Sequence, residues 1–223
     1  MHKRPQAAWA ASHAVLKHAA AISAPGPCTL AWMTLFQVSR VASGFTARSR
    51  WMAEAAPPEE TIELLNNYYA LMFDAIAGEG GVVTLMVGDG LMAVFGAPMP
   101  LPQHEAHAVR AALEMIELVE LFSRERVAQG KAPVRIGIGI ASGEMVAGYA
   151  GTQARATYTC IGDVVNLAAR IEQHTKVAGR AVLVDQATRD ALPADIATES
   201  LGPVEFKGFS AACATFAVKL ATA

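Results

Sequence analysis

The 223-residue sequence predicts an α+β fold in which an antiparallel-rich sheet carries helices on one face. The patterned segments follow the order β-α-β-β-α-β, that of a ferredoxin-like core, with extra strands at the C-terminal end. Two pairs of short β-type runs indicate hairpins, which join strands antiparallel. Hydrophobic residues make up 53% of the chain and charged residues 17%, which suits a packed core.

The first half of this pattern is a candidate strand, a helix and a hairpin. The apolar run from Leu30 to Phe36 is the candidate strand. Proline and acids at 57–60 open a helix, because proline suits the first turn and acids suit the positive end of the helix dipole. Its apolar face repeats every three or four residues, at Ile62, Leu65, Tyr69, Met72 and Ile76. Residues 82–87 and 91–95 then form a hairpin around Gly88, Asp89 and Gly90.

The second half begins with a helix over about residues 103–127 and an alternating strand over 134–140. A second hairpin is predicted from 145–149 and 157–161. Asp163 is an acceptable N-cap for the next helix, which runs to about His174. The last predicted elements are a strand at 181–184, a short helix at 186–192 and strands at 204–207 and 215–218.

Charge is distributed unevenly along the chain. The net charge of −2 argues against a dedicated nucleic-acid binder. Residues 1–53 hold six basic and no acidic side chains, whereas the rest holds twelve basic and twenty acidic ones. We therefore expect an atypical basic segment over residues 1–43 and a patterned domain over residues 44–223.

Cysteine usage and hydropathy indicate a cytoplasmic protein. Cys28, Cys160 and Cys213 are odd in number, widely spaced and form no CxxC pair, which favours reduced thiols. The sequence contains no uninterrupted run of 18 apolar residues, so no membrane span is predicted.

Three polar residues are candidates for chemistry. Asp89 places a carboxylate between two glycines at a hairpin tip, where it suits Mg²⁺ held jointly with phosphate oxygens. Asn166 and Arg170 lie four residues apart, so they share one helix face that can hold phosphate or ribose oxygens. Each motif alone also fits a bland interpretation, an ordinary turn or a solvated helix face.

Five segments, in order and with the expected spacing, resemble the class III adenylate/guanylate cyclase catalytic domain. Gly44-Phe45-Thr46 is similar to the end of the family pattern F-x-D-I-x-G-F-T, and the segment from Gly88 to Pro98 to its second metal segment. The other three matches are 135–148 with the central strands, 158–170 with the substrate segment, and 204–208 with the closing strand.

The resemblance implies a nucleotide cyclase fold and a head-to-tail dimer with composite sites. One chain would supply two Asp residues for two Mg²⁺ or Mn²⁺ ions, and the other would supply base-reading residues, an Asn and an Arg. The ribose 3′-oxygen of ATP would attack the α-phosphate to give cAMP and pyrophosphate.

Carried over residue by residue, the resemblance makes Asp89 the second metal ligand and Asn166 and Arg170 the transition-state pair. The remaining matches are Thr159 as a base-reading residue, Lys207 beside the triphosphate, and Phe45 and Thr46 in the loop over the phosphates. A Thr rather than an Asp at position 159 resembles the bacterial, soluble-type branch of the family, which prefers ATP.

Two positions depart from the family pattern. The first metal Asp falls on Val41 and the base-reading Lys on Leu85, and neither side chain can do the work of the residue it replaces. Loss of one of two metal carboxylates costs roughly a thousandfold in rate. Residues 1–43 are therefore either a diverged start or the product of a shifted reading frame that rejoins near Gly44.

Three interpretations follow from the sequence. The first is an active adenylate cyclase, and the second is a degenerate cyclase domain that binds nucleotide or regulates a dimer partner. The third is a sensor or interaction module that uses the same fold. In a mixed dimer with an intact cyclase, the site that uses Asn166 and Arg170 of this chain would lack only the base-reading Lys.

Overall fold

The computed structural model describes residues 29–40, 58–152 and 155–220. Its strands form one eight-stranded sheet in the order β2-β3-β1-β4-β6-β8-β7, and β5 pairs with β4 off this path. Of the strand pairs within the described residues, β4–β6 is parallel and the others are antiparallel. The predicted antiparallel-rich α+β fold is therefore confirmed. The strands are β1 Thr29–Arg40, β2 Val82–Val87, β3 Gly90–Phe95, β4 Ile136–Thr152, β5 Arg155–Ile161, β6 Val182–Asp185, β7 Thr198–Val204 and β8 Cys213–Val218.

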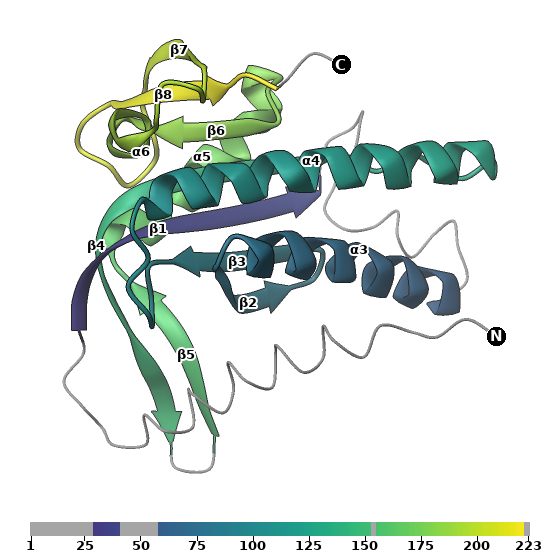
Figure 1. The fold of residues 1–223 in the computed structure, drawn as a ribbon, viewed down its shortest axis with the longest axis horizontal. Helices are drawn as coiled ribbons and strands as arrows, with labels where there is room; N and C mark the ends of the chain where they lie inside the picture. Colours follow the sequence, from purple (N-terminus) through teal and green to yellow (C-terminus); the bar gives the residue numbers. More distant parts are fainter. Residues whose placement is uncertain (1–28, 41–57, 153–154, 221–223) are drawn as a thin grey trace.

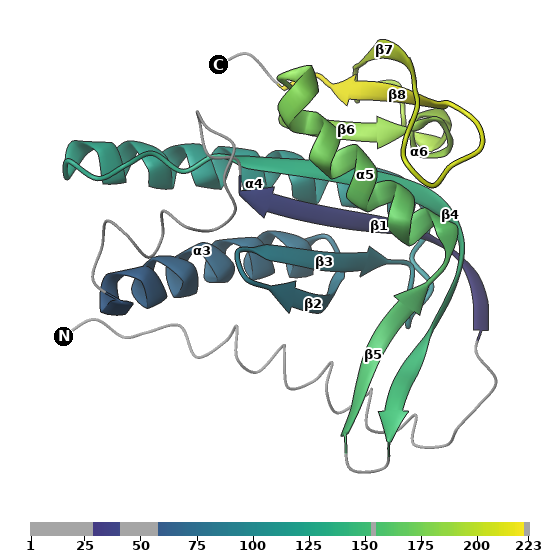
Figure 2. The same ribbon diagram turned by 180° about the vertical axis from the view of Figure 1, so that it is seen from behind.

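The helices cover both faces of this sheet, which corrects the expectation of one covered face. Helices α3 (Pro58–Gly78) and α4 (His104–Ala128) lie over the face seen in Figure 1, and α5 (Asp163–Ala178) lies over the opposite face, seen in Figure 2. Ile138 and Ile140 of β4 pack toward α3 and α4, whereas Ala141 and Met145 pack toward α5. Both faces of β4 are apolar, so each needs a helix to shield it from water.

Several element boundaries differ from those expected. The predicted strand at 134–140 and the first arm of the second hairpin are one continuous strand, β4. Strand β7 ends at Val204, so Lys207 lies in the turn that follows it. Helix α5 is capped by Gly162 without a side-chain hydrogen bond, and Asp163 is its first residue rather than its N-cap. The short helix α6 (Gln186–Ala191) is present as predicted.

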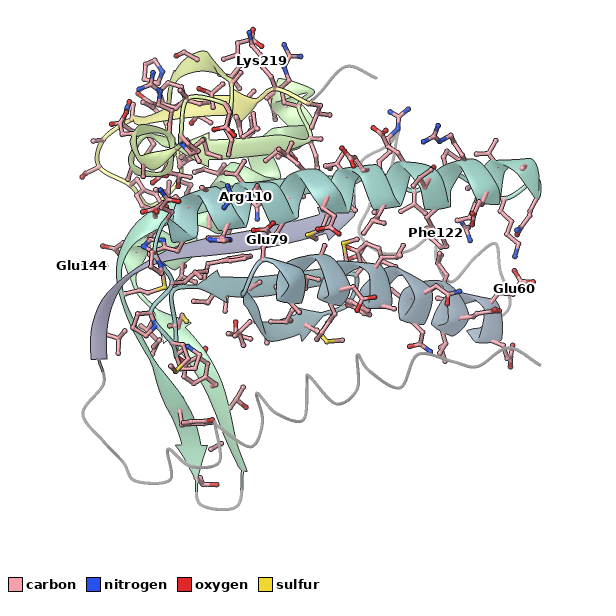
Figure 3. The ribbon with its side chains drawn as sticks, viewed as in Figure 1. Glu60, Glu79, Arg110, Phe122, Glu144 and Lys219 are labelled. Atoms are coloured by element: carbon pink, nitrogen blue, oxygen red, sulfur yellow. The ribbon has the colours of Figure 1, made fainter. Side chains whose placement is uncertain are left out.

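Helix α3 follows its predicted apolar face only in part. Met72 and Ile76 are fully buried against α4 and the sheet, whereas Ile62 is 60% exposed near the N-terminal end of the helix. Glu79, just past the end of α3, accepts hydrogen bonds from Arg110 Nε at 3.3 Å and pairs with His107 Nδ1 at 2.6 Å (Figure 3). These contacts tie the end of α3 to α4.

Two expectations fall at the edges of what the structure covers. Strand β1 confirms and extends the candidate strand at 30–36, but the expected boundary between residues 43 and 44 lies outside the described residues. None of the helices in the described part of the chain is both long enough and apolar enough to cross a lipid bilayer.

Helix α5 rests directly on the backbone of β4 at Gly139. A Cβ atom at this position would overlap the backbone nitrogen of Glu172 and the carbonyl oxygen of Ala168. We expect Gly139→Ala to lower the free energy of unfolding by about 3 kcal/mol, because neither backbone group can rotate away. Urea unfolding followed by circular dichroism measures this loss.

Gly143 provides the matched control on the same strand and the same side. A Cβ there would lie 3.5 Å from Val164 Cγ2, which is ordinary van der Waals contact. We expect Gly143→Ala to change the unfolding free energy by less than about 1 kcal/mol. Equal losses in the two variants would contradict the close contact at Gly139.

Candidate functional site

Asn166, Arg170 and Lys207 line one cavity of about 500 Å³ on the α5 side of the molecule. Asn166 and Arg170 project from the first two turns of α5, and Lys207 comes from the turn after β7. The Arg170 guanidinium donates a hydrogen bond from Nη1 to Gln173 Oε1 at 3.2 Å. The rest of the lining is Asp163, Ala169, Gln173, Gly208 and Phe209.

This cavity offers more positive than negative charge. Arg170 and Lys207 face one acidic side chain, Asp163, at the beginning of the helix. Arg170 can hold two phosphate oxygens at once, and Lys207 adds a mobile point charge. The arrangement therefore suits a phosphate-bearing ligand with a polar group within reach of Asn166.

The N-terminal turn of α5 is fixed against β4. The Val164 side chain lies against Gly143, and a Cβ at Gly162 would come within 3.2 Å of Met145 Cβ. Val165 N donates to Gly162 O at 3.1 Å, which closes the first turn. Because these contacts hold the first turn of α5 against β4, Asn166 and Arg170 stand on a packed helix rather than on a loop.

Asp89 lies elsewhere, at the tip of the β2–β3 hairpin, and does not line this cavity. Val87 pairs with Gly90, so Gly88 and Asp89 form a two-residue turn. Gly88 has a φ of 63°, in the region where glycine carries no steric cost. The single chain thus holds the carboxylate and the cationic cavity apart.

Tyr69 is a residue of this hairpin site that the sequence analysis assigned only to an apolar helix face. Its hydroxyl donates to Gly88 O at 2.6 Å, and Gly90 O lies 3.5 Å from the same oxygen. Burial, together with the negative charge of Asp89, raises the pKa of Tyr69 above its ordinary value, so the hydroxyl keeps its proton at neutral pH. The signal in the sequence that could have indicated this role is a hydroxyl-bearing ring on an otherwise aliphatic helix face.

The described residues fit one divalent cation held jointly with phosphate oxygens, and they do not fit two. Asp89 is the carboxylate of the hairpin tip, and Mg²⁺ commonly binds one or two carboxylates plus substrate phosphates. Strand β1 runs beside β3, with Val38 opposite Leu91, yet residues 29–40 contain no acid. Within the described part of the chain, no three His, Cys, Asp or Glu side chains cluster as metal ligands. Val41 lies outside the described residues.

The two predicted base-reading positions also lie apart from the cavity. Leu85 is 47% exposed on the edge strand β2, and Thr159 is half-buried on β5, opposite Gly148. Phe45 and Thr46 lie outside the described residues. The structure thus brings Asn166, Arg170 and Lys207 together, and it leaves Asp89, Leu85 and Thr159 on other elements.

Comparison with known proteins identifies the family. Residues 42–219 match the model of the adenylate and guanylate cyclase catalytic domain. The chain is 33% identical over 161 residues to adenylate cyclase 1 of Rhizobium meliloti, an alignment that covers 72% of this chain and 24% of that protein. It is 37% identical over 139 residues to an adenylate cyclase of Anabaena cylindrica, which covers 60% of this chain and 27% of that protein. The chain belongs to the adenylate and guanylate cyclase catalytic domain family.

Solved structures agree with this assignment. The adenylyl cyclase CyaB from P. aeruginosa superposes with a TM-score of 0.76 at 27% identity, over 87% of this chain and 96% of that one. The guanylyl cyclase Cya2 superposes with a TM-score of 0.74 at 26% identity, over 86% of this chain and 93% of that one. Cyclase domains of this family bind nucleotide, use divalent metal ions and act as dimers. The chain spans about a quarter of the length of the curated relatives it matches first.

The thiol next to Thr159 provides a test of the β4–β5 packing. Burial raises the pKa of Cys160 to about 11, from 9.0 for a free thiol. At pH 8 the thiolate population should therefore be on the order of a hundredfold smaller than in the unfolded chain. We expect iodoacetamide to alkylate Cys160 correspondingly slowly in the native protein, as measured by peptide mass spectrometry. Equal rates in buffer and in urea would contradict this burial.

Proposed function

We propose that this domain binds ATP and supports its conversion to cAMP and pyrophosphate in a composite site formed with a second cyclase domain. The observation that carries this proposal is the shared cavity of Asn166, Arg170 and Lys207, with Asp89 held at a separate place in the same chain. A head-to-tail dimer would bring the cavity of one chain to the hairpin of the other. The family assignment and the adenylate cyclase relatives favour ATP as the substrate.

The cavity residues have separate roles in this reaction. The ribose 3′-oxygen forms a bond to the α-phosphorus as the bond to the pyrophosphate oxygen breaks, and the 3′-hydroxyl proton is released. Arg170 stabilises the charge that builds up on the transferring phosphoryl group, and Asn166 orients the ribose. Lys207 binds the triphosphate. A divalent cation at Asp89 would neutralise phosphate charge.

Exposed apolar side chains favour a partner domain. Leu85 and Met86 on β2, and Tyr149 and Ile161 on the β4–β5 hairpin, are each about half exposed or more. Large apolar side chains in contact with water are typical of an interaction surface. We therefore place the dimer contact on β2 and the β4–β5 hairpin, for either a homodimer or a heterodimer.

A second candidate is a degenerate cyclase domain that acts as a nucleotide-binding or regulatory partner. It is favoured by the single carboxylate at the metal position and by Leu85, which cannot donate a hydrogen bond to a purine base. Both candidates use the same cavity, and they differ in whether turnover occurs when two copies of this chain pair.

The experiment that separates the two candidates is cyclic nucleotide formation by the purified chain with ATP or GTP and excess Mn²⁺. We expect weak but measurable cAMP formation, because one carboxylate of the two-ion site is missing. The degenerate candidate predicts no product even with excess Mn²⁺. Vigorous cAMP production would overturn the degenerate interpretation and show that the loss at Val41 is tolerated.

A mixed dimer tests the role of Arg170 directly. The partner is an intact adenylate cyclase domain whose own transition-state Arg is replaced by Ala, so the remaining site uses Asn166 and Arg170 of this chain. We expect measurable cAMP formation, and Arg170→Ala should lower it by roughly a hundredfold or more.

Lys176→Ala is the matched control for this variant. It removes one cation from α5 six residues further along, outside the cavity. It should leave activity within about twofold of the unsubstituted mixed dimer. If the Arg170→Ala mixed dimer forms cAMP as fast as the unsubstituted mixed dimer, the proposed role of the cavity is wrong.

A further inference from the structure

The β2–β3 hairpin carries Asp89 at one end of the sheet order, where its position is least restrained. Strand β2 is the edge strand, and its pairing with β3 is irregular between Val83 and Leu85. The turn has two residues, and a Cβ at Gly88 would meet no atom within 4 Å. An edge hairpin with an open glycine turn relies on outside contacts to hold one geometry.

Tyr69 supplies such a contact from a different element. It lies on α3, three residues before Met72 and seven before Ile76, and both of these are fully buried. These spacings place the three side chains on one helix face, so the core fixes the Tyr69 ring. Its hydroxyl donates to Gly88 O at 2.6 Å and reaches Gly90 O at 3.5 Å.

The two acceptor carbonyls belong to the residues on either side of Asp89. The one hydroxyl proton is donated to Gly88 O at 2.6 Å, whereas Gly90 O at 3.5 Å lies at the limit of hydrogen-bond distance. Holding the Gly88 carbonyl restricts rotation of the peptide group that precedes Asp89. A carboxylate fixed before the ligand arrives binds a cation more tightly, because less conformational entropy is lost on binding. A hydroxyl bound to neutral carbonyls also leaves both carboxylate oxygens of Asp89 available as metal ligands.

We propose that Tyr69 is the positioning residue of the hairpin metal site: by holding the peptide group that precedes Asp89, it sets the affinity of that carboxylate for a nucleotide-bound divalent cation. This inference rests on the proposed function, since it takes Asp89 as the cation ligand. It adds a residue of α3 to a site otherwise made by the hairpin.

Tyr69→Phe is the variant that tests the proposal. It keeps the ring, which packs at 5.4 Å from the Tyr68 ring, and removes only the hydroxyl. Two measurements are made on the full chain. Amide hydrogen exchange at residues 88–91, followed by NMR without metal, reports the restraint on the turn. Titration of Mn²⁺ with an α,β-methylene ATP analogue, followed by the EPR signal of free Mn²⁺, reports cation affinity.

We expect Tyr69→Phe to speed exchange at residues 88–91 and to weaken Mn²⁺ binding by about threefold to tenfold, the usual worth of one such hydrogen bond. Thr84→Val is the matched control. It removes another side-chain-to-backbone hydrogen bond of this hairpin, from Thr84 Oγ1 to Met92 O at 3.3 Å, away from the turn. It should leave Mn²⁺ binding unchanged.

Each alternative outcome overturns the proposal in a different way. Unchanged exchange in Tyr69→Phe would show that the hydroxyl does not restrain the turn. Faster exchange with unchanged Mn²⁺ affinity would reduce Tyr69 to a structural residue. A third outcome concerns the metal site itself and is tested with Asp89→Asn. If this variant binds Mn²⁺ as tightly as the unsubstituted chain, Asp89 is not the cation ligand. The metal site of the proposed function and the positioning role of Tyr69 are then both wrong.

Discussion

The contact between α5 and the backbone of β4 at Gly139 is the constraint on which the candidate site depends. Strand β4 lies at the centre of the sheet and pairs with β1, β5 and β6, so its position is set from both sides. Because α5 touches this strand backbone to backbone, no side chain can adjust the distance between them. The direction of Asn166 and Arg170 is therefore fixed by the sheet.

The separation of charges within the chain has an electrostatic logic. A carboxylate beside Arg170 and Lys207 would form ion pairs with them and reduce their attraction for phosphate. With Asp89 on the β2–β3 hairpin, outside the cavity, the cavity keeps its excess of basic side chains and the hairpin keeps its carboxylate. Each half then attracts an opposite part of a metal–nucleotide complex. In the proposed composite site, the two halves would meet when a second domain is present.

The sequence allowed most of the secondary structure and the site residues on α5 to be predicted, because these depend on local patterns. The spacing of four between Asn166 and Arg170 defines a shared helix face wherever the helix packs. The grouping of Lys207 with them depends on a turn far along the chain, and only the resemblance indicated it. The second covered face of the sheet was missed because it depends on side chains from distant strands meeting α5.

Other features had no local signal. The continuity of β4 through residue 152 was hidden by its glycines, which read as a break between strands. Tyr69 fits an apolar helix face by periodicity, and its hydrogen bond to Gly88 arises only when the hairpin folds against α3. Ile62 shows the opposite case. Its spacing places it on the apolar face of α3, but it is exposed because that turn of the helix extends beyond the core. Periodicity identifies a face, but tertiary packing decides how much of that face is covered.

The uninterrupted length of β4 has a mechanical consequence. The first half of β4 contains Gly139 and Gly143, on which α5 packs. The C-terminal end of β4 projects with β5 away from the rest of the molecule (Figure 1). Thr152 lies nine residues beyond Gly143, which corresponds to about 30 Å measured along the extended strand. Strand β4 curves between these two parts (Figure 1, Figure 2), yet its backbone is continuous, so a partner that displaces the projecting end would also displace the segment on which α5 rests. The position of the β4–β5 hairpin and the direction of the Arg170 guanidinium are therefore coupled through one strand.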